Sequence, residues 1–431
     1  MIAVLAFINK AITKTVFFSY NLSQQGKLFS IYRKVKQCIE GRETISTSKL
    51  PGYLKSWGFD KDITKAPILT KEDIKKHTVK LVPKRVYKYF YTGGSTGEPI
   101  KIPHSRQRAL LRTASILYYN EAGGYNLGDR YLFIRSKPKS KFFQFLRNEV
   151  LFVPNDLSKD RIAKLAKTLI RKKVSVIIGY PSVIYELAVY INQNLSLKKS
   201  LSVKAFISNS EPFDEERGRF IKDVLDCKII DRYSNEENGV IAQQREFGGE
   251  YLVDCYNLYV EVVDPVTLKP VAEGETGKVL VTDIYSDLIP MVRYDSGDFA
   301  VAAKYKNGQL WSIKQIVGRV VDLFYTTSGK PISPLMLGPY IRLPLTNLGI
   351  HIQFQLSQLK INTFHLQLKA KGAAIPHASL NEVKEGLKKV LGQDAIIEIK
   401  FVVDIKAQPS GKRPLYRNEI SEKEKATLND L

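Results

Sequence analysis

The chain has 431 residues, of which 44% are hydrophobic and 25% are charged, so it is long enough to form two or three globular domains. No run of about 18 or more uncharged apolar residues occurs, which excludes an ordinary membrane-spanning helix. The formal net charge of +23 would attract nucleotides, nucleic acids and anionic membranes. Because the basic residues are scattered and no zinc-finger, RNP-type or basic-region motif occurs, we expect a basic solvated surface and no specific nucleic-acid partner.

The N-terminal region reads as helical. Ile2 to Ile8 is wholly apolar, but no basic residue precedes it and no small-residue cleavage site follows, which argues against a signal peptide. We expect an amphipathic helix that either packs on the body or lies on a membrane surface. Residues 21–83 look helical and polar, and Thr70 with Asp73 forms a start that resembles a capping box.

Three cysteines, Cys38, Cys227 and Cys255, are widely separated and include no CxxC pair. An odd, dispersed set argues against a disulfide framework and against a structural zinc site. We therefore expect a cytoplasmic protein, with peripheral contact to the inner face of the membrane as an alternative.

A glycine-rich loop spans Thr92 to Gly97 and holds three glycines and three hydroxyl residues. Such a loop presents backbone N–H groups and hydroxyls to an anion, which indicates a phosphate site. Both flanks, residues 86–91 and 100–102, look like strands, so a hairpin turn is the competing interpretation. It is not a Walker A loop, because Glu98-Pro99 follows the last glycine instead of Lys-Ser/Thr.

From Asp160 the chain alternates amphipathic helices with short apolar strands, a pattern typical of a parallel sheet covered by helices. Ligands of such sheets bind at the carboxyl ends of the strands. Three polar segments follow predicted strands, and we expect them to form one pocket rim: 179–182, 208–212 and 231–237. The predicted helices are 105–121, 183–191 and 214–225 with one that starts at 160, and the predicted strands are 174–178, 203–207 and 227–230.

Beyond Gly248 the pattern changes to antiparallel β structure, with strands at 258–263 and 278–285. We predict an α/β N-terminal domain over 1–320, with parallel sheets covered by helices, an antiparallel β portion and a helical extension at 1–50. A small, mobile α+β domain is predicted over 323–431. Its expected elements are helices at 333–341 and 380–391, a hairpin at 351–368 and a strand at 396–403.

Five motifs follow one another in the order of a known family. They are Thr-Gly-Gly-Ser-Thr-Gly-Glu-Pro at 92–99, Arg-Tyr-Ser-Asn-Glu-Glu at 232–237, Arg-Tyr-Asp-Ser-Gly-Asp at 293–298, Gly-Arg-Val-Val-Asp at 318–322 and Ser-Gly-Lys at 410–412. Because it has these five motifs in this order, the chain resembles the adenylate-forming ligase superfamily over roughly residues 50–415. Pro-Ile-Leu-Thr-Lys-Glu-Asp at 67–73 and the short N-terminus resemble the phenylacetate–CoA ligase branch, especially its CapK-type members associated with capsular polysaccharide.

The resemblance implies a reaction in two steps. A carboxylic acid attacks the α-phosphate of ATP and gives an acyl-adenylate and pyrophosphate, and a thiol, amine or hydroxyl then displaces AMP. Catalysis of this kind depends on positioning and electrostatics. The implied cofactors are ATP and Mg²⁺, and the acceptor stays open between coenzyme A and a sugar, amine or carrier.

By the same resemblance, Tyr233 would stack on adenine, Asp298 would bind both ribose hydroxyls, and Arg319 would contact ribose or phosphate. Tyr233 as a strand-end aromatic and Asp298 as a turn residue are the competing interpretations. Ser210 and Glu211 belong to the same predicted ATP site. The β- and γ-phosphates, and thus the leaving pyrophosphate, would be held by Thr92, Gly93, Gly94, Ser95, Thr96 and Gly97.

Glu237 would bind Mg²⁺ through its carboxylate, and Lys412 would reach the substrate carboxylate and the α-phosphate. The competing interpretation of Lys412 is a solvated lysine in a basic tail. Asp322 marks the expected hinge of the small domain. Glu236 stands where the family has Thr or Ser, so the choice of metal ligand between Glu236 and Glu237 stays open.

Other departures from the family pattern are Ser234 for glycine and Val321 for an aspartate, and residues 243–251 lack cysteine and histidine, so we expect no zinc. The departures support an alternative in which a degenerate ligase serves as a scaffold at the membrane surface during polysaccharide assembly. The identity of the acid is not encoded in any motif. Its pocket is expected near residues 180–185 and 208–213.

Overall fold

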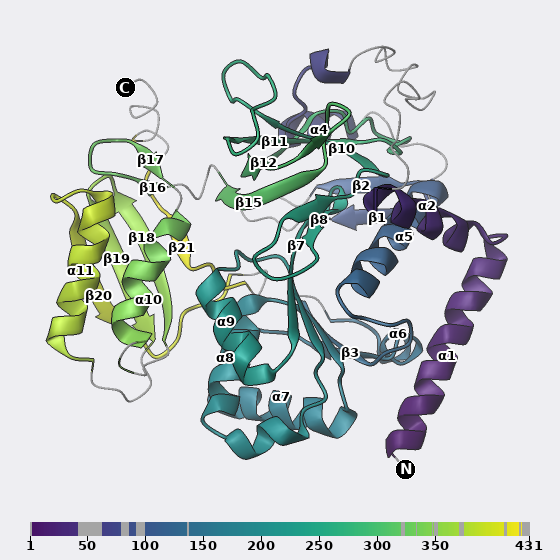
Figure 1. Ribbon diagram of the computed structural model, residues 1–431, viewed down its shortest axis with the longest axis horizontal. Coiled ribbons are helices and arrows are strands. Elements are labelled where there is room, and N and C mark those ends of the chain that lie inside the picture. The colour runs from purple at the N-terminus through teal and green to yellow at the C-terminus, as the bar shows by residue number, and fades with distance from the viewer. Residues whose placement is uncertain are drawn as a thin grey trace. The chain divides into compact units, whose positions relative to one another are not determined.

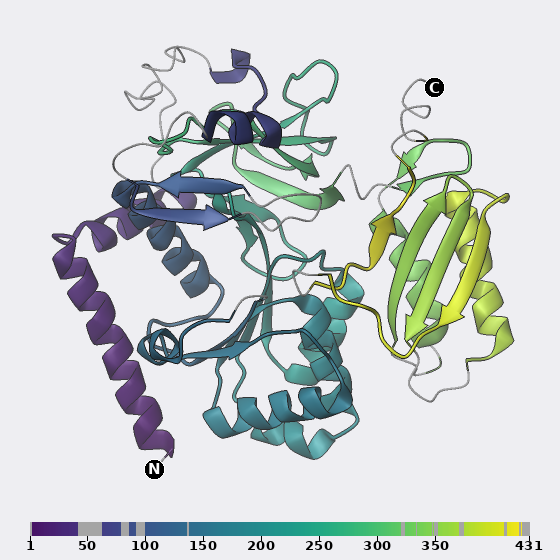
Figure 2. The same cartoon turned by 180° about the vertical axis from the view of Figure 1, so that it is seen from behind.

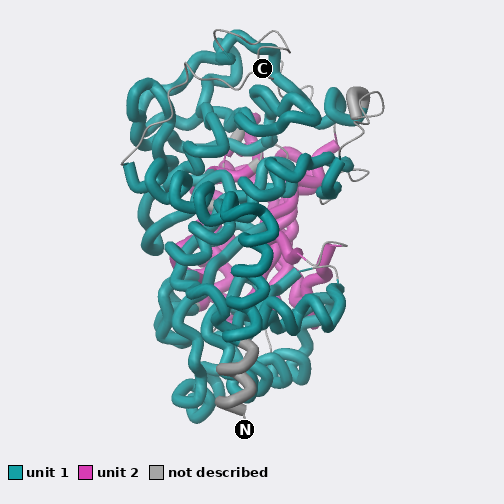
Figure 3. The backbone as a smooth tube through the Cα atoms, turned by 90° about the vertical axis from the view of Figure 1, so that its right-hand side faces the viewer, with its two compact units in different colours: residues 1–213, 218–316 teal, residues 214–217, 317–431 magenta. Residues whose placement is uncertain are grey.

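The computed structural model describes residues 2–41, 63–78, 86–91, 100–135, 138–319, 324–332, 334–346, 348, 352–369, 375–408, 412–421 and 424. The glycine loop at 92–99 and the predicted hinge residue Asp322 lie outside the described residues. The chain divides into two compact units, coloured separately in Figure 3. The first contains residues 1–213 and 218–316, and the second contains 214–217 and 317–431.

The first unit is built on a mixed sheet of 11 strands in the order β10-β11-β12-β15-β9-β8-β7-β6-β5-β3-β4 (Figure 1). Strands β4, β3, β5, β6 and β7 run parallel, whereas β8 pairs antiparallel with β7. Strand β7 therefore joins a parallel half to an antiparallel half, and the predicted fold class is confirmed. The bounds are β3 Tyr131–Ile134, β4 Glu149–Phe152, β5 Val176–Gly179, β6 Ala205–Ser208, β7 Lys228–Asn235, β8 Gly239–Gln244, β9 Tyr251–Val253, β10 Leu258–Val263, β11 Thr276–Asp283, β12 Tyr294–Ala302 and β15 Ser312–Arg319.

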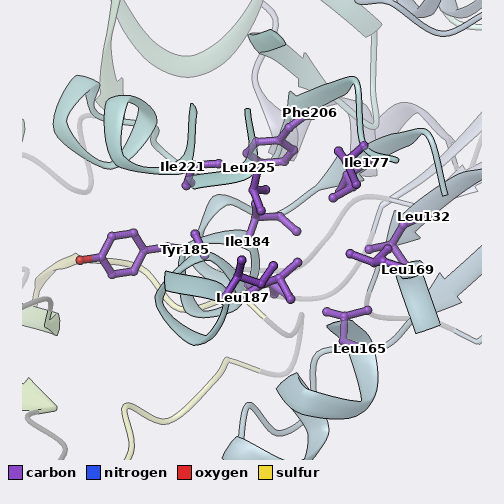
Figure 4. Packing of buried hydrophobic residues seen from close by; sticks show 14 of the residues in the cluster. Leu132, Leu165, Leu169, Ile177, Ile184, Tyr185, Leu187, Phe206, Ile221 and Leu225 are labelled. Carbon is purple, nitrogen blue, oxygen red and sulfur yellow. The ribbon is translucent and has the colours of Figure 1, made fainter. Parts of the chain in front are cut away.

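Three helices cover one face of the parallel half. The predicted apolar face of α7 is buried at Ile162, Leu165, Ala166 and Leu169, and it packs against α8 in a core to which α9 also contributes (Figure 4). Burial of these apolar side chains is the main favourable contribution to folding in this region. The helices of the unit are α1 Ile2–Ser23, α2 Lys27–Ile39, α4 Lys71–Thr78, α5 Arg106–Ala122, α6 Lys141–Leu146, α7 Lys159–Lys172, α8 Pro181–Asn192 and, from residue 218 onward, α9 Glu215–Leu225, with 3₁₀ turns η2 Ile63–Lys65 and η3 Leu195–Ser200.

Helix α2 packs on α5 and β8 through a separate apolar cluster that includes Cys38 and Cys255. All three cysteines are free and buried, and no disulfide framework is present among the described residues. Nevertheless, the Sγ atoms of Cys38 and Cys255 lie 2.9 Å apart, although 217 positions separate them in the sequence. The sequence spacing gave no indication of this contact.

A two-stranded hairpin, β1 Lys88–Tyr91 and β2 Lys101–His104, flanks the glycine loop on both sides, as predicted. Nearby, the backbone N–H of Thr70 donates to Asp73 at 2.9 Å, and the Asp73 N–H donates back to the Thr70 hydroxyl at 3.3 Å. This reciprocal capping box starts α4 and confirms the sequence prediction. Leu69 hydrogen-bonds to the backbone of Arg293 and Asp295, so α4 is held beside the start of β12.

The second unit contains a four-stranded sheet in the order β20-β19-β18-β21, with two helices and its own apolar core (Figures 1 and 2). The predicted α+β character of the C-terminal part is confirmed. The bounds are β18 Gln353–Lys360, β19 Thr363–Lys369, β20 Ile396–Phe401, β21 Tyr416–Asn418, η5 Pro334–Leu337, α10 Gly338–Thr346 and α11 His377–Leu391; minor hairpins are β13 Tyr305–Lys306 with β14 Gln309–Leu310 and β16 Phe324–Tyr325 with β17 Pro331–Ile332.

Among the described helices of the whole chain, none combines the length and apolar character needed to cross a bilayer.

Candidate active site

One face of β12 organises the candidate site. Tyr294, Ser296 and Asp298 are alternate residues of β12 across a bulge opposite Val279, and we call their three side chains the buried face of β12. All three are buried, whereas the intervening Asp295 and Gly297 are partly exposed. Residues from two other predicted motifs meet this face. The site therefore brings together positions that are distant in the sequence.

Tyr233 on β7 reaches the far end of this face. Its hydroxyl donates to Oδ2 of Asp298 at 2.6 Å and lies 3.3 Å from the hydroxyl of Ser296. Tyr233 and Asp298 were predicted from separate motifs as the adenine and ribose residues. Adenine and ribose are adjacent in a nucleotide, so the contact between the two residues fits these roles.

Glu237 lies at the other end of the face. The hydroxyl of Tyr294 donates to Oε1 of Glu237 at 3.0 Å, and Nζ of Lys71 lies 3.8 Å from the same oxygen. The side chain of Glu237 is only 6% exposed. A buried carboxylate held by a hydroxyl and an ammonium group is fixed in orientation and keeps its charge balanced.

Glu236 has a different environment from its neighbour. Its side chain is 55% exposed and lies 3.4 Å from a guanidinium nitrogen of Arg112. Arg112 also donates to the backbone carbonyl of Glu236 at 2.8 Å. Of the two adjacent carboxylates, Glu237 is the one that contacts Tyr294 on β12.

The residues around Glu237 fit a magnesium ion that is bound together with a phosphate substrate. Among the described residues no group of three or more His, Cys, Asp or Glu side chains converges as a metal cage. Mg²⁺ does not need such a cage, because it commonly uses one or two protein carboxylates, waters and substrate phosphates. Asn238, directly after Glu237, is 2% exposed, and neither polar atom of its amide has a hydrogen-bond partner in the described part of the chain. The oxygen donors of Glu237 and Asn238 suit this hard cation.

Arg112 connects the carboxylate pair to the hairpin that carries the glycine loop. Its guanidinium group lies 4.1 Å from the centre of the Phe90 ring on β1, a cation–π contact. Burial lowers the pKa of Arg112 to about 10, while the charge of Glu236 acts in the opposite direction, so the group remains a cation at neutral pH. Arg112 therefore contacts both the loop-bearing hairpin and the β7–β8 turn.

The three polar strand ends are joined by hydrogen bonds. The backbone N–H and the hydroxyl of Ser182 both donate to Glu211 at 3.0 Å, and Ser208 donates to Asp231 at 2.8 Å. Ser210 has a φ of 68°, a left-handed conformation that is uncommon for serine. Such backbone strain occurs often at functional sites. Ser210 and Glu211 thus lie at the carboxyl edge of the parallel strands, where the sequence placed them.

Two further predicted residues, Arg319 and Lys412, belong to the second unit. Arg319 ends β15, and Lys412 lies in the segment before β21. The carbonyl of Lys412 accepts from the N–H of Gln408 at 2.9 Å. Its neighbour Arg413 is 3% exposed and donates to the carbonyl of Ile405 at 3.1 Å, which anchors the backbone next to Lys412.

Sequence reasoning missed four residues of this site: Lys71, Arg112, Asn238 and Tyr294. Lys71 and Tyr294 lie inside motifs that carried the family resemblance, so their positions were available as a signal although no role was attached to them. Arg112 lies on a helix with no motif. Only the folded structure brings it to Glu236 and Phe90.

The model of the AMP-binding enzyme family matches residues 7–284, which is more than half of the chain, so the protein belongs to this family. It is an adenylate-forming ligase of the branch that its motifs predicted. It is similar to Protein CapK of Staphylococcus aureus, with 22% identity over 375 residues that cover 83% of this chain and 81% of that protein. It is also similar to phenylacetate-coenzyme A ligase of Pseudomonas putida, with 24% identity over 54% of this chain and 52% of that enzyme.

Solved structures show the same fold. The 2-hydroxyisobutyryl-CoA ligase in its postadenylation state has a TM-score of 0.65 and 18% identity, and the match covers 94% of this chain and 90% of that one. The anthranilate CoA ligase AuaEII in complex with anthranoyl-AMP has a TM-score of 0.55 and 17% identity, over 76% of this chain and 65% of that one. At these identities the likeness establishes the fold alone.

Proposed function

We propose that the protein uses ATP and Mg²⁺ to convert a small carboxylic acid into an acyl-adenylate and then transfers the acyl group to coenzyme A or another nucleophile. The observation that carries this proposal is the buried face of β12, where Tyr233 meets Asp298 and Tyr294 meets Glu237. One end of this face suits a nucleoside and the other suits a metal-bound phosphate. Both ends belong to the single strand β12, at Asp298 and at Tyr294.

Different residues of the site would bind the nucleoside and the metal ion. Asp298 would accept hydrogen bonds from the ribose hydroxyls, and Tyr233 would contact the adenine ring while its own hydroxyl orients Asp298. Glu237 and Asn238 would hold Mg²⁺, with Glu237 oriented by Tyr294. When bound, the ion would neutralise phosphate charge during attack on the α-phosphate. Lys71 would add a second positive charge near the same phosphates.

The remaining roles stay with the residues that the motifs indicated. Residues 92–97 would hold the β- and γ-phosphates, and Lys412 would approach the substrate carboxylate and the α-phosphate in the adenylation step. Lys412 belongs to a separate unit, and a hinge at Asp322 would bring it in for the first step and withdraw it for the second. Arg319 would contact ribose or phosphate.

The acceptor and the biological setting rest on the relatives. Phenylacetate-coenzyme A ligase and 2-hydroxyisobutyryl-CoA ligase are named for coenzyme A, which favours a thiol acceptor here. The similarity to CapK, which extends over most of both chains, favours a cytoplasmic role in envelope or capsular polysaccharide biosynthesis. In that setting a sugar or an amine is the competing acceptor.

Pyrophosphate exchange with a panel of carboxylic acids tests the first step. We expect exchange of labelled pyrophosphate into ATP that depends on Mg²⁺ and on one acid class. The Lys412→Ala variant should bind ATP normally but lose exchange by about a hundredfold or more. The variant lacks the positive charge that would offset the negative charge of the carboxylate and the α-phosphate as the bond between them forms. Absence of exchange with every acid, in protein that binds ATP, would refute adenylation.

Product analysis tests the second step. Once an acid is found, the reaction is run with coenzyme A, with amino sugars and with neither, and the products are identified by mass spectrometry. A thioester that forms only with coenzyme A supports the thiol acceptor. An amide or ester of the sugar with no thioester would assign the protein to the polysaccharide-linked reaction instead.

A further inference from the structure

Two segments of the chain are basic and entirely free of acidic residues. Residues 1–39 contain six Lys and Arg residues and no Asp or Glu, and residues 130–148 likewise contain six and none. These two segments account for about half of the net charge of +23. Residues 74–97 and 161–185 are equally basic and also lack Asp and Glu, so charge alone does not single out these two segments.

The fold places the two segments together. Helix α1 from the first segment contacts α6 from the second, and both views of the first unit show them side by side along one edge (Figures 1 and 2). Of the basic residues in the two segments, Lys10 and Lys14 lie on α1 and Lys141 lies on α6, and neither helix has an acidic residue. We call the exposed surface of α1 from Lys10 onward and of α6 the α1–α6 surface.

Large apolar side chains are exposed on this same surface. On α6, a short helix of six residues, Phe142, Phe143 and Phe145 are 63%, 53% and 47% exposed. On α1, Phe18 and Leu22 are 55% and 74% exposed. Single exposed apolar residues are ordinary, but several on two adjacent helices indicate an interaction site.

The acidic partners near this surface are few and buried. Asp129 pairs with Lys10, and Glu149 pairs with Lys139. Lys14 and Lys141 are exposed and form no ion pair with the residues that the structure describes. The net positive charge of the surface is thus not cancelled by the protein itself.

We propose that the α1–α6 surface binds an anionic phospholipid bilayer, with the phenylalanines inserted at the level of the headgroups and the lysines against lipid phosphates. Exposed aromatic and aliphatic side chains beside lysines are the composition of interfacial membrane helices. A nucleic acid or a soluble polyanion would use the lysines but gains nothing from exposed aliphatic residues such as Leu22. A second copy of the chain is disfavoured, because two such surfaces would place like charges together.

Sedimentation of the full-length protein with vesicles tests this proposal. One set of vesicles is pure phosphatidylcholine, and the other contains about one third phosphatidylglycerol. We expect binding to the anionic vesicles only, with a loss on the order of tenfold when salt is raised from about 0.1 to 0.5 M, because screening shortens the reach of the charges.

Two sets of variants separate the apolar and the charged contributions. The triple variant Phe142→Ser, Phe143→Ser, Phe145→Ser should weaken vesicle binding by about tenfold or more. A matched control, Leu195→Ser with Val266→Ser, removes exposed apolar side chains from elsewhere in the same unit and should bind normally. Lys14→Glu with Lys141→Glu should also weaken binding and leaves the phenylalanines in place.

Three results would overturn the proposal. Equal binding to neutral and anionic vesicles, or no binding to either, excludes an anionic bilayer. Tight binding to heparin that the triple phenylalanine variant retains, with no vesicle binding, assigns the surface to a soluble polyanion. A change in the oligomeric state of the triple variant, measured by sedimentation velocity, assigns it to a second copy of the chain.

Discussion

At the scale of single residues, Tyr294 is the side chain whose removal is most informative. It is fully buried, and its hydroxyl donates to the carboxylate that we assign to Mg²⁺. Tyr294→Phe keeps the ring and removes only this hydrogen bond. Loss of a partner that orients a metal ligand commonly weakens metal binding by 10- to 100-fold, so we expect roughly a tenfold rise in the Mg²⁺ concentration needed for exchange.

Direct titration with Mn²⁺ in the presence of a non-hydrolysable ATP analogue measures the same affinity without turnover. Tyr305→Phe is the matched control, because the Tyr305 hydroxyl donates to a backbone carbonyl, that of Val271 at 2.8 Å. If Tyr294→Phe and Tyr305→Phe have equal metal affinities, Tyr294 does not orient the metal ligand.

A second residue, His104, should make stability depend on pH. Burial, with the nearby charges of Arg108, Arg112 and Lys88, lowers the pKa of His104 to about 2. In the unfolded chain it titrates near 6.5, so below that pH only the unfolded chain gains the proton. The contribution of neutral His104 to the free energy of unfolding is therefore complete above pH 6.5. It decreases as the pH falls, by about 2 kcal/mol between pH 6.5 and 5.

Denaturant unfolding at several pH values measures this effect. The His104→Gln variant, which cannot titrate, should show a smaller loss of unfolding free energy between pH 6.5 and 5 than the unmodified protein. The slope of stability against pH is the quantity to compare, since the substitution also changes packing against Phe90. Identical slopes would mean that His104 is already protonated in the folded protein.

At the scale of secondary structure elements, Arg112 links the β1–β2 hairpin to the β7–β8 turn. If the glycine loop holds the β- and γ-phosphates, loosening this link should weaken ATP binding and leave AMP binding unchanged. We expect Arg112→Leu to weaken ATP binding by about tenfold, because the cation–π contact and the bond to Glu236 are lost together.

Arg161 offers a closely matched control for this variant. It also lies over a phenylalanine ring, that of Phe152 at 5.3 Å, and it also donates to a backbone carbonyl, that of Val153 at 2.8 Å. Arg161→Leu should bind ATP and AMP normally. Equal losses for ATP and AMP in Arg112→Leu would show a general disturbance of the site rather than an effect on the loop.

Local sequence patterns predicted some secondary structure elements and missed others. Strand β10 has the bounds that its β-branched residues and flanking turns predicted, and the Thr70 cap starts α4 as expected, because both depend on neighbouring residues. No element was predicted between residues 122 and 159, where the structure has β3, α6 and β4. These elements are four to six residues long, too short for a periodic signal, and their form depends on the sheet around them.

At the scale of the whole molecule, the motifs predicted the family and the identity of several site residues, but not how these residues meet. The contacts of Arg112 with Glu236 and of Cys38 with Cys255 join positions more than a hundred residues apart. Such contacts follow from the order of strands in the 11-stranded sheet, above all from β7, which carries Tyr233 and joins the two halves. Local propensity contains no information about this order.

The two units have separate apolar cores, and Lys412 belongs to the unit that does not hold Tyr233, Glu237 and Asp298. A unit with its own core is expected to fold by itself. The fragment 1–316 should therefore bind ATP with an affinity within about threefold of the full chain, since all described candidate nucleotide residues except Arg319 and Lys412 lie within it. It should show no pyrophosphate exchange, because the lysine is absent. Calorimetry measures binding and isotope exchange measures catalysis on the same samples; exchange by the fragment at a rate comparable to the full chain would remove Lys412 from the adenylation step.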